Sequence, residues 1–301
     1  MSEPKTVSAV EDGIRLRRFL ARHYPDAGMM DIRKLCRTGE IRINSRRCGE
    51  AAVLRAGDRI RIPPSLGRAA KIAPMPKRQE FSLAELERLR QLIIHNDDDI
   101  VIFSKPAGLA VQGGGGIKKS LDKMAAALFP NDMVLLVHRL DMGTTGIIVL
   151  AKNQASAQRL AAAFQTHEVR KTYMAVLAGD VTPKKGEIET PINEKYALTK
   201  YEVLANVKGL LSLVRYGPET GRKHQLRIHS AVGLGAPIVG DDTYGSRELD
   251  RQVKDLIDIR HIYLFAAKIS FRHPRTGKLL TITAQPPEWF KKATKVIKGE
   301  I

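Results

Sequence analysis

Two apolar runs joined by a short turn lie near the middle of the chain. The first run, 133–137, leads into His138-Arg139-Leu140-Asp141, and a second apolar run follows the Gly- and Thr-rich turn and ends at Ala151-Lys152. Two strands with a tight turn between them fit this pattern, and they hold Asp141 at the edge of a sheet with Arg139 close by. Loops braced by rigid strands often carry reactive groups. The same spacing also fits a plain hairpin in which Asp141 only caps the turn.

The charge of the chain indicates a polyanionic partner. Its 50 Lys and Arg residues exceed its 32 Asp and Glu residues, which gives a formal net charge of +18. Residues 1–79 hold 18 of the basic and 8 of the acidic side chains, so about a quarter of the chain carries more than half of the net charge. This asymmetry predicts a separate electrostatic module, and nucleic acid is the commonest partner of so basic a protein.

The remaining bulk properties favour a cytoplasmic protein that does not enter a membrane. With 43% hydrophobic residues, the 301-residue chain can bury the cores of two domains. No apolar run approaches the roughly 18 residues of a membrane span, and the polar start lacks a secretory pattern. Cys36 and Cys48 have neither zinc-finger spacing nor a disulfide framework, which favours a reducing cytoplasm. We also expect a monomer.

Residues 14–62 are predicted to form a small basic domain. Apolar residues at helical spacing indicate one helix around 16–20 and a second helix that ends before Gly39. Alternating strands follow at 40–44 and 57–62, with arginines on one face. Two short basic helices and a small basic sheet resemble the S4 RNA-binding domain.

A run of charge is usually only a solvated face, but here the arginines recur on both helices and both strands, which favours RNA binding. Such a surface is expected to contact backbone phosphates rather than base edges. The residues expected to bind RNA are Arg17, Arg18, Arg33, Lys34, Arg37, Arg42, Arg46 and Arg47.

Residues 63–80 are expected to form a basic linker, because they contain four prolines and no apolar period. Residues 81–295 are expected to form one larger domain. Ser82 and Glu85 make a capping box for a helix that runs through Ile94. We expect a further helix at 156–167 and strands at 100–103, 171–178, 199–207, 210–216, 222–229, 262–271 and 279–284. Strands dominate without strict βαβ alternation, which predicts an α+β fold with a mixed, largely antiparallel sheet.

A glycine run at 113–116 precedes Lys118-Lys119-Ser120. A phosphate-binding P-loop requires Gly directly before the Lys-Ser pair, and Lys118 occupies that position, so a P-loop phosphotransferase is a poor fit. The run is either a flexible loop or a loop that contacts RNA.

The central turn reads His138-Arg139-Leu140-Asp141-Met142-Gly143-Thr144-Thr145-Gly146. With the apolar residues and Ala151-Lys152 that follow, it resembles the signature of the RluA-type pseudouridine synthases, which isomerise chosen uridines in RNA. The family form has Thr-Ser-Gly where this chain has Thr144-Thr145-Gly146, an exchange of one hydroxyl residue for another. The basic first domain and the glycine run resemble the branch that acts on large-subunit ribosomal RNA. The small-subunit type typically carries Gly, not His, before Arg-Leu-Asp.

The resemblance covers most of residues 95–290 and implies roles for four of them. Asp141 is implied to be the catalytic carboxylate, Tyr173 the active-site aromatic residue and Arg227 the basic partner of Asp141. Arg139 matches the family arginine implicated in displacing the target base. We expect the substrate to be bound by Arg139, His138, Arg222 and Gln225.

The expected reaction suits these residue types. It breaks the N-glycosidic bond, rotates the uracil and rejoins it through carbon, so no redox change, group donor or cofactor is needed. An ionised carboxylate can act at the sugar, and a guanidinium group lowers its pKa and orients it. A tyrosine can stack on the base and serve proton transfer. Direct attack on the sugar and a route through a glycal both stay open.

Several alternatives remain within the sequence. If 222–229 is a strand, Arg222 and Arg227 face opposite sides, and the resemblance favours Arg227 as the partner of Asp141. His138, His224 and His229 could suggest a metal site, but without clustered Cys or carboxylates we expect hydrogen-bonding residues and no metal. Spacing does not exclude other tyrosines as the active-site aromatic residue: Tyr196, Tyr201, Tyr216, Tyr244 and Tyr263.

The sequence therefore supports a two-domain RNA pseudouridine synthase whose substrate is large-subunit (23S) ribosomal RNA. The alternative is a non-catalytic RNA-binding or ribosome-assembly factor on a synthase scaffold. Loss of Asp141, Tyr173 or Arg227 would indicate that alternative, and all three residues are present.

Overall fold

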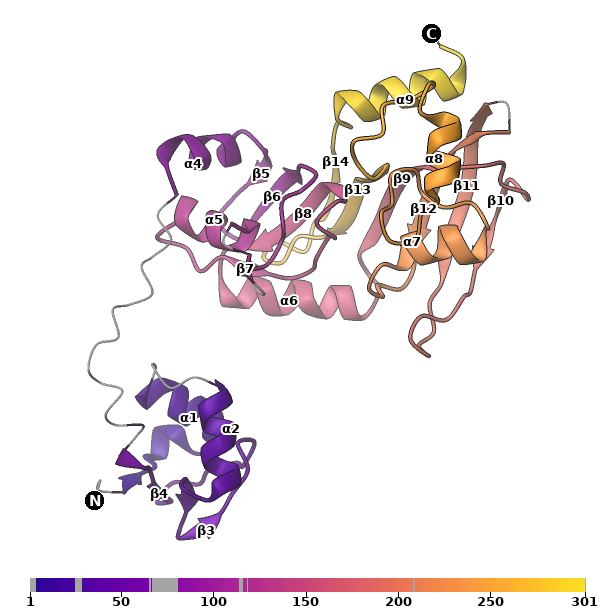
Figure 1. Ribbon diagram of the computed structural model, residues 1–301. Helices are drawn as coiled ribbons and strands as arrows, with labels where there is room; N and C mark the ends of the chain where they lie inside the picture. Colours follow the sequence, from indigo (N-terminus) through magenta and orange to yellow (C-terminus); the bar gives the residue numbers. More distant parts are fainter. Residues whose placement is uncertain are drawn as a thin grey trace. The chain divides into compact units, whose positions relative to one another are not determined.

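The chain divides into two compact units, Met1–Glu80 and Phe81–Ile301 (Figure 1). The computed structural model describes residues 4–24, 29–64, 66, 81–113, 116–117, 119–207 and 209–300. Most of the expected linker at 63–80 lies outside the described residues, as do Gly114, Gly115 and Lys118 of the glycine-rich segment.

The first unit is a small helical domain with a four-stranded sheet of order β1-β4-β2-β3, all of whose pairs are antiparallel. Its elements are β1 (Lys5–Thr6), η1 (Ala9–Glu11), α1 (Leu16–His23), α2 (Met29–Thr38), β2 (Arg42–Ile43), β3 (Arg46–Arg47) and β4 (Arg59–Arg61). β1 precedes Ile14, where the sequence analysis places the start of this domain. The strands are shorter than the alternating segments predicted, because only these residues pair across the sheet.

The apolar faces predicted for the two helices form the core of this unit. Leu16, Phe19 and Leu20 of α1 are buried together with Ile32 and Cys36 of α2. α2 ends at Thr38, and the Gly39 that follows has a positive φ of 74°, which suits the left-handed position after a helix. Burying the apolar residues leaves the basic ones outside: Arg17, Arg18, Arg33, Lys34, Arg37, Arg46 and Arg47 are exposed, and Arg42 is partly buried.

The second unit is built on a ten-stranded sheet of order β10-β11-β12-β9-β13-β8-β6-β5, with β14 on β13 and β7 on β8. Its strands are β5 (Ile93–Asn96), β6 (Ile100–Lys105), β7 (Leu135–Leu136), β8 (Thr145–Ala151), β9 (Arg170–Ala178), β10 (Lys185–Ile188), β11 (Thr199–Val207), β12 (Leu211–Pro218), β13 (Leu264–Arg272) and β14 (Leu279–Thr283). Of the pairs between these described strands, only β8–β13 is parallel. The predicted α+β fold with a mixed, largely antiparallel sheet is confirmed.

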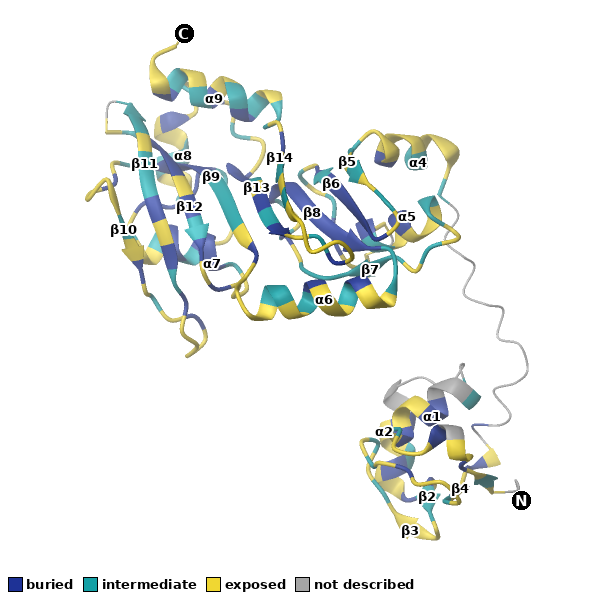
Figure 2. Cartoon of the chain, turned by 180° about the vertical axis from the view of Figure 1, so that it is seen from behind, coloured by how far each residue is buried: buried dark blue, intermediate teal, exposed yellow. Residues whose placement is uncertain are grey.

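The helices of this unit lie against the sheet and expose their outward sides to solvent (Figure 2). They are α4 (Leu83–Arg90), α5 (Leu121–Leu128), α6 (Gln154–Gln165), α7 (Gln225–Ile228), α8 (Arg247–Val253) and α9 (Glu288–Lys298), with a π-helical turn, η2 (His229–Gly233). α6 packs on β7 and β8, α8 on β9, and α9 on β11 and β12. Within the described ranges, no helix combines the length and the hydropathy that crossing a bilayer requires.

The central strands β6 and β8 are buried on both faces. Ile100, Ile102, Ile147 and Val149 contribute to the core cluster under α6, whereas their neighbours in sequence face a second cluster with α5. A strand covered on both sides needs an unbroken apolar run rather than an alternating one. This explains the run after the Asp141 turn and fixes β8 in the middle of the sheet.

One predicted helix is too long. The capping box of Ser82 and Glu85 is confirmed, but α4 ends at Arg90 and does not continue through Ile94. Ile93–Asn96 instead forms the edge strand β5, which pairs with β6. The β-branched pair Ile93-Ile94 favours a strand, and β6 offers it an open edge, so tertiary pairing overrides the helical period.

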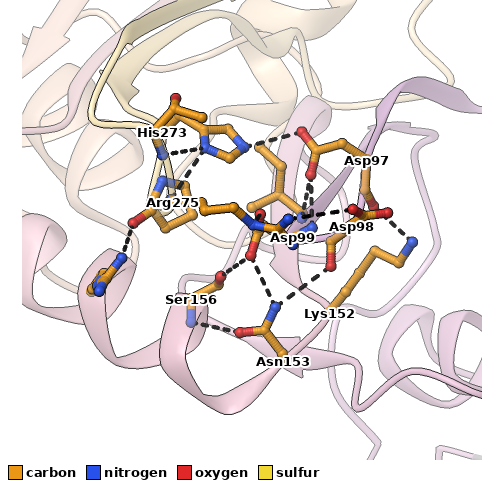
Figure 3. Close-up of polar contacts among 12 residues, drawn as sticks. Asp97, Asp98, Asp99, Lys152, Asn153, Ser156, His273 and Arg275 are labelled. Carbon is orange, nitrogen blue, oxygen red and sulfur yellow. Dashed lines mark hydrogen bonds and ion pairs between the residues drawn. The ribbon is translucent and has the colours of Figure 1, made fainter.

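An acidic loop between β5 and β6 ties three parts of this unit together (Figure 3). Asp99 accepts hydrogen bonds from Asn153 and Ser156 at the start of α6 and pairs with Arg275 beyond β13 at 2.5 Å. Asp97 contacts His273 at 3.1 Å. The carboxylates of Asp97 and Asp99 and a His273 nitrogen lie within 4.8 Å of one another. Arg275 and these hydrogen bonds compensate the acidic charge, so the cluster acts as a clamp within the fold.

Candidate active site

The structure brings all seven expected site residues of the second unit to one cavity of about 450 Å³. These residues are His138, Arg139, Asp141, Tyr173, Arg222, Gln225 and Arg227. A second cavity, of about 750 Å³, adjoins the first, since Arg139, Asp141 and Arg227 line both. Asp141 therefore stands where two hollows meet, with a side chain that is 29% exposed.

Sheet register explains why the Asp141 turn and Tyr173 meet although β13 lies between their strands. Ala266 of β13 pairs with Gly146 of β8 on one side and with Tyr173 of β9 on the other. Tyr173 is therefore level with the start of β8, immediately after the turn that carries Asp141. Tyr173 also pairs with Tyr216 near the end of β12, and the chain that leaves β12 supplies Arg222 and Arg227.

The turn that carries Asp141 is held by its backbone. The Asp141 carbonyl accepts from the Thr144 amide at 3.1 Å, and the Met142 carbonyl accepts from the Gly108 amide at 3.0 Å. The Lys105 ammonium, only 1% exposed, donates to the carbonyls of Met142, Leu109 and Pro106. Burial lowers the pKa of Lys105 to about 8, and the charge of Asp141 opposes that shift. A buried cation thus fixes the loops on which Asp141 stands.

Arg227 faces Asp141 but is held by Asp241. Its guanidinium donates two hydrogen bonds to the buried Asp241 carboxylate, at 2.7 and 2.6 Å, and lies 3.8 Å from Asp141. The hydrogen bonds that Arg227 donates to Asp241 raise the pKa of Arg227. Burial alone would raise the pKa of Asp241, but the bonds from Arg227 and from the amides of Tyr244 and Thr243 lower it overall. A two-pronged contact of this kind fixes the plane of the guanidinium, which leaves the Asp141 carboxylate open to the cavity.

His224 is a second neighbour of Asp141, with its Nε2 atom 3.9 Å from an Asp141 oxygen. Its other ring nitrogen contacts the Tyr244 hydroxyl at 3.0 Å, and the Tyr244 ring lies under Arg227, 5.1 Å from centroid to guanidinium. The backbone of His224 has a positive φ of 56°. Such a conformation in a residue other than glycine is uncommon and concentrates at functional sites.

The predicted strand at 222–229 is wrong. His224 precedes a short helix, α7, which leads directly into η2, and Arg227 lies on this helix. The side chain of Gln225 explains the local fold: it accepts from the Thr220 hydroxyl and the Arg222 amide and donates to the Leu198 carbonyl and the Thr199 hydroxyl. These four bonds satisfy the amide within the protein. Strand parity therefore does not decide between Arg222 and Arg227; the helix places Arg227 beside Asp141.

Arg222 and Arg139 lie at the open side of the cavity. Both are exposed. The Arg222 guanidinium donates to the Tyr196 carbonyl at 2.9 Å. Within the described residues, Arg139 has no hydrogen bond or ion pair, so its guanidinium is available to a ligand.

Tyr173 and His138 form the inner wall of the same cavity. Burial and the charge of Asp141 both raise the pKa of Tyr173, so its hydroxyl stays protonated at neutral pH. Burial lowers the pKa of His138 to about 3, with a contribution from the charge of Lys171. The neutral ring of His138 accepts a hydrogen bond from the Val149 amide at 2.9 Å and stacks on Phe164.

The rival tyrosines lie elsewhere. Tyr201, Tyr216 and Tyr263 are buried, and their hydroxyls bond to protein groups. Tyr244 supports Arg227 and His224, and Tyr196 is exposed. Among the described residues that line the 450 Å³ cavity, Tyr173 is the tyrosine.

The three histidines weighed as metal ligands each have a hydrogen-bond partner. His138 and His224 are described above. His229 contacts the Thr199 hydroxyl and the Thr190 carbonyl, both at 2.9 Å.

The sequence predicts no catalytic or substrate-binding role for four residues of this site. Lys105, Lys171, His224 and Asp241 are each close to Asp141, Tyr173 or Arg227, but they come from separate segments and share no spacing. Asp241 carried a usable signal, because the segment Gly240-Asp241-Asp242-Thr243-Tyr244-Gly245 also resembles the family.

Comparison with known proteins shows the family to which this chain belongs. The model of the RNA pseudouridylate synthase family matches residues 99–232, the range that contains Asp141, Tyr173 and Arg227. The ribosomal large subunit pseudouridine synthase C of Vibrio parahaemolyticus is 34% identical to this chain, across 99% of this chain and 98% of that protein. This chain belongs to the RNA pseudouridylate synthase family.

Two further members of the family are similar over most of their length. The protein of the same name from Escherichia coli is 30% identical, across 97% of this chain and 96% of that protein. The solved structure of human RNA pseudouridylate synthase domain containing 4 is 26% identical, with a TM-score of 0.59, and the match covers 71% of this chain and 95% of that chain. The family is one of RNA isomerases, so this chain is assigned to that class of enzyme.

Proposed function

We propose that this protein converts specific uridines of large-subunit ribosomal RNA to pseudouridine, with Asp141 as the catalytic carboxylate. The observation that carries this proposal is the position of Asp141: partly exposed between two cavities, beside an arginine that another carboxylate holds in place. The choice of RNA follows from the relatives, which are named as synthases of the ribosomal large subunit.

Each proposed role has a physical basis in the site. Asp141 acts at the anomeric carbon of the ribose, either by bonding to it or by assisting loss of the base. Arg227, whose guanidinium lies 3.8 Å from Asp141, orients that carboxylate. The ring of Tyr173 supports the uracil while it turns. Arg139, exposed and unpaired among the described residues, enters the RNA stack in place of the target base, as extraction of a nucleotide from a helix requires.

The contacts of the remaining predicted residues refine their roles. Gln225 acts by holding the 220–225 loop, since its amide is satisfied by protein groups. His138 shapes the wall of the cavity as a neutral ring. Arg222 and the exposed Lys223 at the open side suit the phosphates that flank the target nucleotide.

We further propose that the first unit is an S4-type RNA-binding domain. Its exposed arginines and lysine surround a core of two short helices and a small sheet, which supports phosphate contact rather than reading of bases. The protein is proposed to act as a cytoplasmic monomer, and light scattering of the purified chain measures its mass in solution.

Tritium release tests the proposed function. Unmodified ribosomal RNA labelled at carbon 5 of uracil loses its label as the new bond to carbon forms. We expect release with the wild-type protein and none with Asp141→Ala, whereas both proteins bind the RNA with similar affinity. Asp242→Ala is a matched control, because that carboxylate is 93% exposed and does not face Asp141 in any described contact.

Two results would contradict the proposal. Residual release by Asp141→Ala would remove Asp141 from the catalytic role. Binding without release by the wild type, on naked RNA and on precursor particles of the large subunit alike, would favour a ribosome-assembly factor on a synthase scaffold.

A further inference from the structure

Lys171 is a partly buried cation at the inner end of the 450 Å³ cavity. It lies on β9, two residues before Tyr173, so the two side chains leave the same face of the strand with their Cα atoms roughly 6.6 Å apart. Within the described part of the chain, the Lys171 ammonium has neither a hydrogen bond nor an ion pair. Lys105 and Arg227, by contrast, donate hydrogen bonds to protein groups.

The surroundings of Lys171 do not balance its charge. The neighbouring His138 is neutral, and Phe164 stacks on its ring. Glu219 acts on Lys171 only at long range, and its carboxylate is exposed and pairs with Lys200 at 3.1 Å. Burial accordingly lowers the pKa of Lys171. An unpaired ammonium in such a position is costly to the fold, and a cavity that contains one is prepared for a ligand that carries or develops negative charge.

We propose that Lys171 is a further catalytic residue, which contacts the carbonyl edge of the target uracil and stabilises the negative charge that the ring acquires when the glycosidic bond breaks. This assignment rests on the proposed synthase function and extends it to the step in which the base is free. Asp141, Tyr173 and Lys171 line the cavity in common. With the ribose at Asp141 and the uracil against Tyr173, the far edge of the ring is directed to Lys171.

The chemistry requires a stabiliser at that place. When the bond between the anomeric carbon and the ring nitrogen breaks, its electron pair leaves with the uracil, and the charge spreads over the two carbonyl oxygens. This holds whether Asp141 bonds to the sugar or a glycal forms. Carbon 5 of the turned ring then uses an electron pair to bond the anomeric carbon. If Asp141 had bonded to that carbon, its bond breaks and returns the electron pair to the carboxylate; if a glycal had formed, the sugar takes back the proton it had lost. Carbon 5 then gives its proton to water, and the former glycosidic nitrogen takes one up. Nothing is oxidised or consumed, and Lys171 keeps its proton throughout.

The other cations near the cavity are less suited to this task. Arg227 is committed to Asp241, to which it donates two hydrogen bonds. Arg139, Arg222 and Lys223 are exposed, where water screens their charge. A preorganised charge in a site that excludes water is worth far more to a transition state than the same charge in solvent.

Single-turnover tritium release with Lys171→Met tests the inference. Loss of one such stabilising donor typically lowers the rate about 10²- to 10³-fold. We expect a loss of this size at saturating RNA, with the dissociation constant for RNA unchanged. Lys171→Arg keeps a cation and is expected to recover part of the rate. The matched control is Arg170→Met, which removes an exposed positive charge one residue earlier on β9 and is expected to react like the wild type.

The outcomes separate the inference from the function on which it rests. Thermal unfolding checks that each variant folds. If Lys171→Met does not fold, Lys171→Gln takes its place, and the same loss of rate is expected. A folded Lys171 variant with the wild-type rate would overturn the inference while leaving the synthase function intact. A loss of RNA affinity with no loss of saturating rate would also overturn it, because Lys171 would then bind a phosphate. Failure of the wild type to release tritium would instead contradict the proposed function.

Discussion

At the scale of single residues, two different carboxylates contact Arg227. Asp141 is the group proposed to react, and Asp241 is the group that holds Arg227 in place. Arg227 donates two hydrogen bonds to Asp241 at 2.7 and 2.6 Å, but its nearest atom is 3.8 Å from Asp141. The strong contact, between Arg227 and Asp241, therefore orients the guanidinium. The weaker contact, between Arg227 and Asp141, leaves the lone pairs of Asp141 free. Asp241 is consequently a positioning residue that acts through Arg227.

Replacing Asp241 tests this division of roles. In Asp241→Asn the buried guanidinium loses its ionic partner, so we expect the saturating rate of tritium release to fall about 10²-fold, the size of effect that misplacement of a catalytic group produces. Removing one member of a buried ion pair also costs about 3 kcal/mol of stability. Urea unfolding and single-turnover kinetics measure the two effects.

The neighbouring carboxylate provides the control for Asp241. Asp242 also contacts Arg227, at 3.3 Å, but its side chain is 93% exposed. Asp242→Asn is expected to match the wild type in rate and in unfolding. Equal effects of the two variants would show that overall negative charge, rather than the two-pronged bond, supports Arg227.

At the scale of elements, the sequence predicted the segments in which buried apolar residues recur at a regular spacing. It missed the segment whose buried residues are polar. The helix faces of the first unit and the doubly buried strands β6 and β8 follow from apolar spacing, and the structure confirms them. The segment 222–229 alternates like a strand, yet its buried residues include Gln225, Arg227 and His229. Their partners lie in the 190–199 and 241–242 segments, and no pattern within the segment itself reveals them.

The candidate site shows the same limit. Asp141 could be found because a short turn between two apolar runs holds it, and Tyr173 and Arg227 were added only by the family resemblance. His224, Asp241 and Lys105 act through contacts between segments that are distant in sequence. A single sequence does not state the sheet register that brings these segments to one place.

The register of β8 and β13 makes a prediction at this scale. Gly146 has a positive φ of 105°, and a Cβ added there would lie 2.3 Å from the Ala266 carbonyl oxygen of β13. Gly146→Ala must therefore push apart the one parallel pair among the described strands, and we expect a loss of about 3 kcal/mol or more from overpacking and backbone strain. Urea unfolding measures this loss.

Gly221→Ala is the matched control for that experiment. Gly221 has no positive φ, and a Cβ there would meet no atom within 4 Å. A residue with freedom of this kind is expected to stay within about 1 kcal/mol of the wild type. A Gly146→Ala protein of wild-type stability would mean that β8 and β13 are less closely paired than the structure indicates.

At the scale of the whole molecule, we propose that RNA binding and chemistry are divided between the two units. The proposed catalytic groups all belong to the second unit, whereas residues 1–79 carry more than half of the net charge of +18. Much of the affinity for RNA is therefore expected to come from a part of the chain that takes no part in the reaction. Affinity and saturating rate should then respond to different substitutions.

Neutralising two arginines of the first unit tests that separation. Arg37 and Arg46 are exposed, and neither has a hydrogen bond or ion pair within the described residues. If both contact phosphates, the variant Arg37→Gln/Arg46→Gln should bind RNA more weakly, and the slope of log affinity against log salt should fall by roughly 1.5, since each lost contact contributes about 0.7–0.9. The saturating rate of tritium release should stay unchanged, because Asp141, Tyr173 and Arg227 are untouched.

Arg251→Gln on α8 controls for the loss of any surface arginine, because Glu248 already balances that charge at 3.1 Å. It is expected to leave the salt slope unchanged. An unaltered slope in the double variant would mean that these arginines of the first unit are only solvated and do not contact RNA. The affinity for RNA would then have to come from the exposed basic residues beside the cavity. A reduced saturating rate in the double variant would mean that the first unit also places the target uridine, so that binding and chemistry are coupled rather than divided.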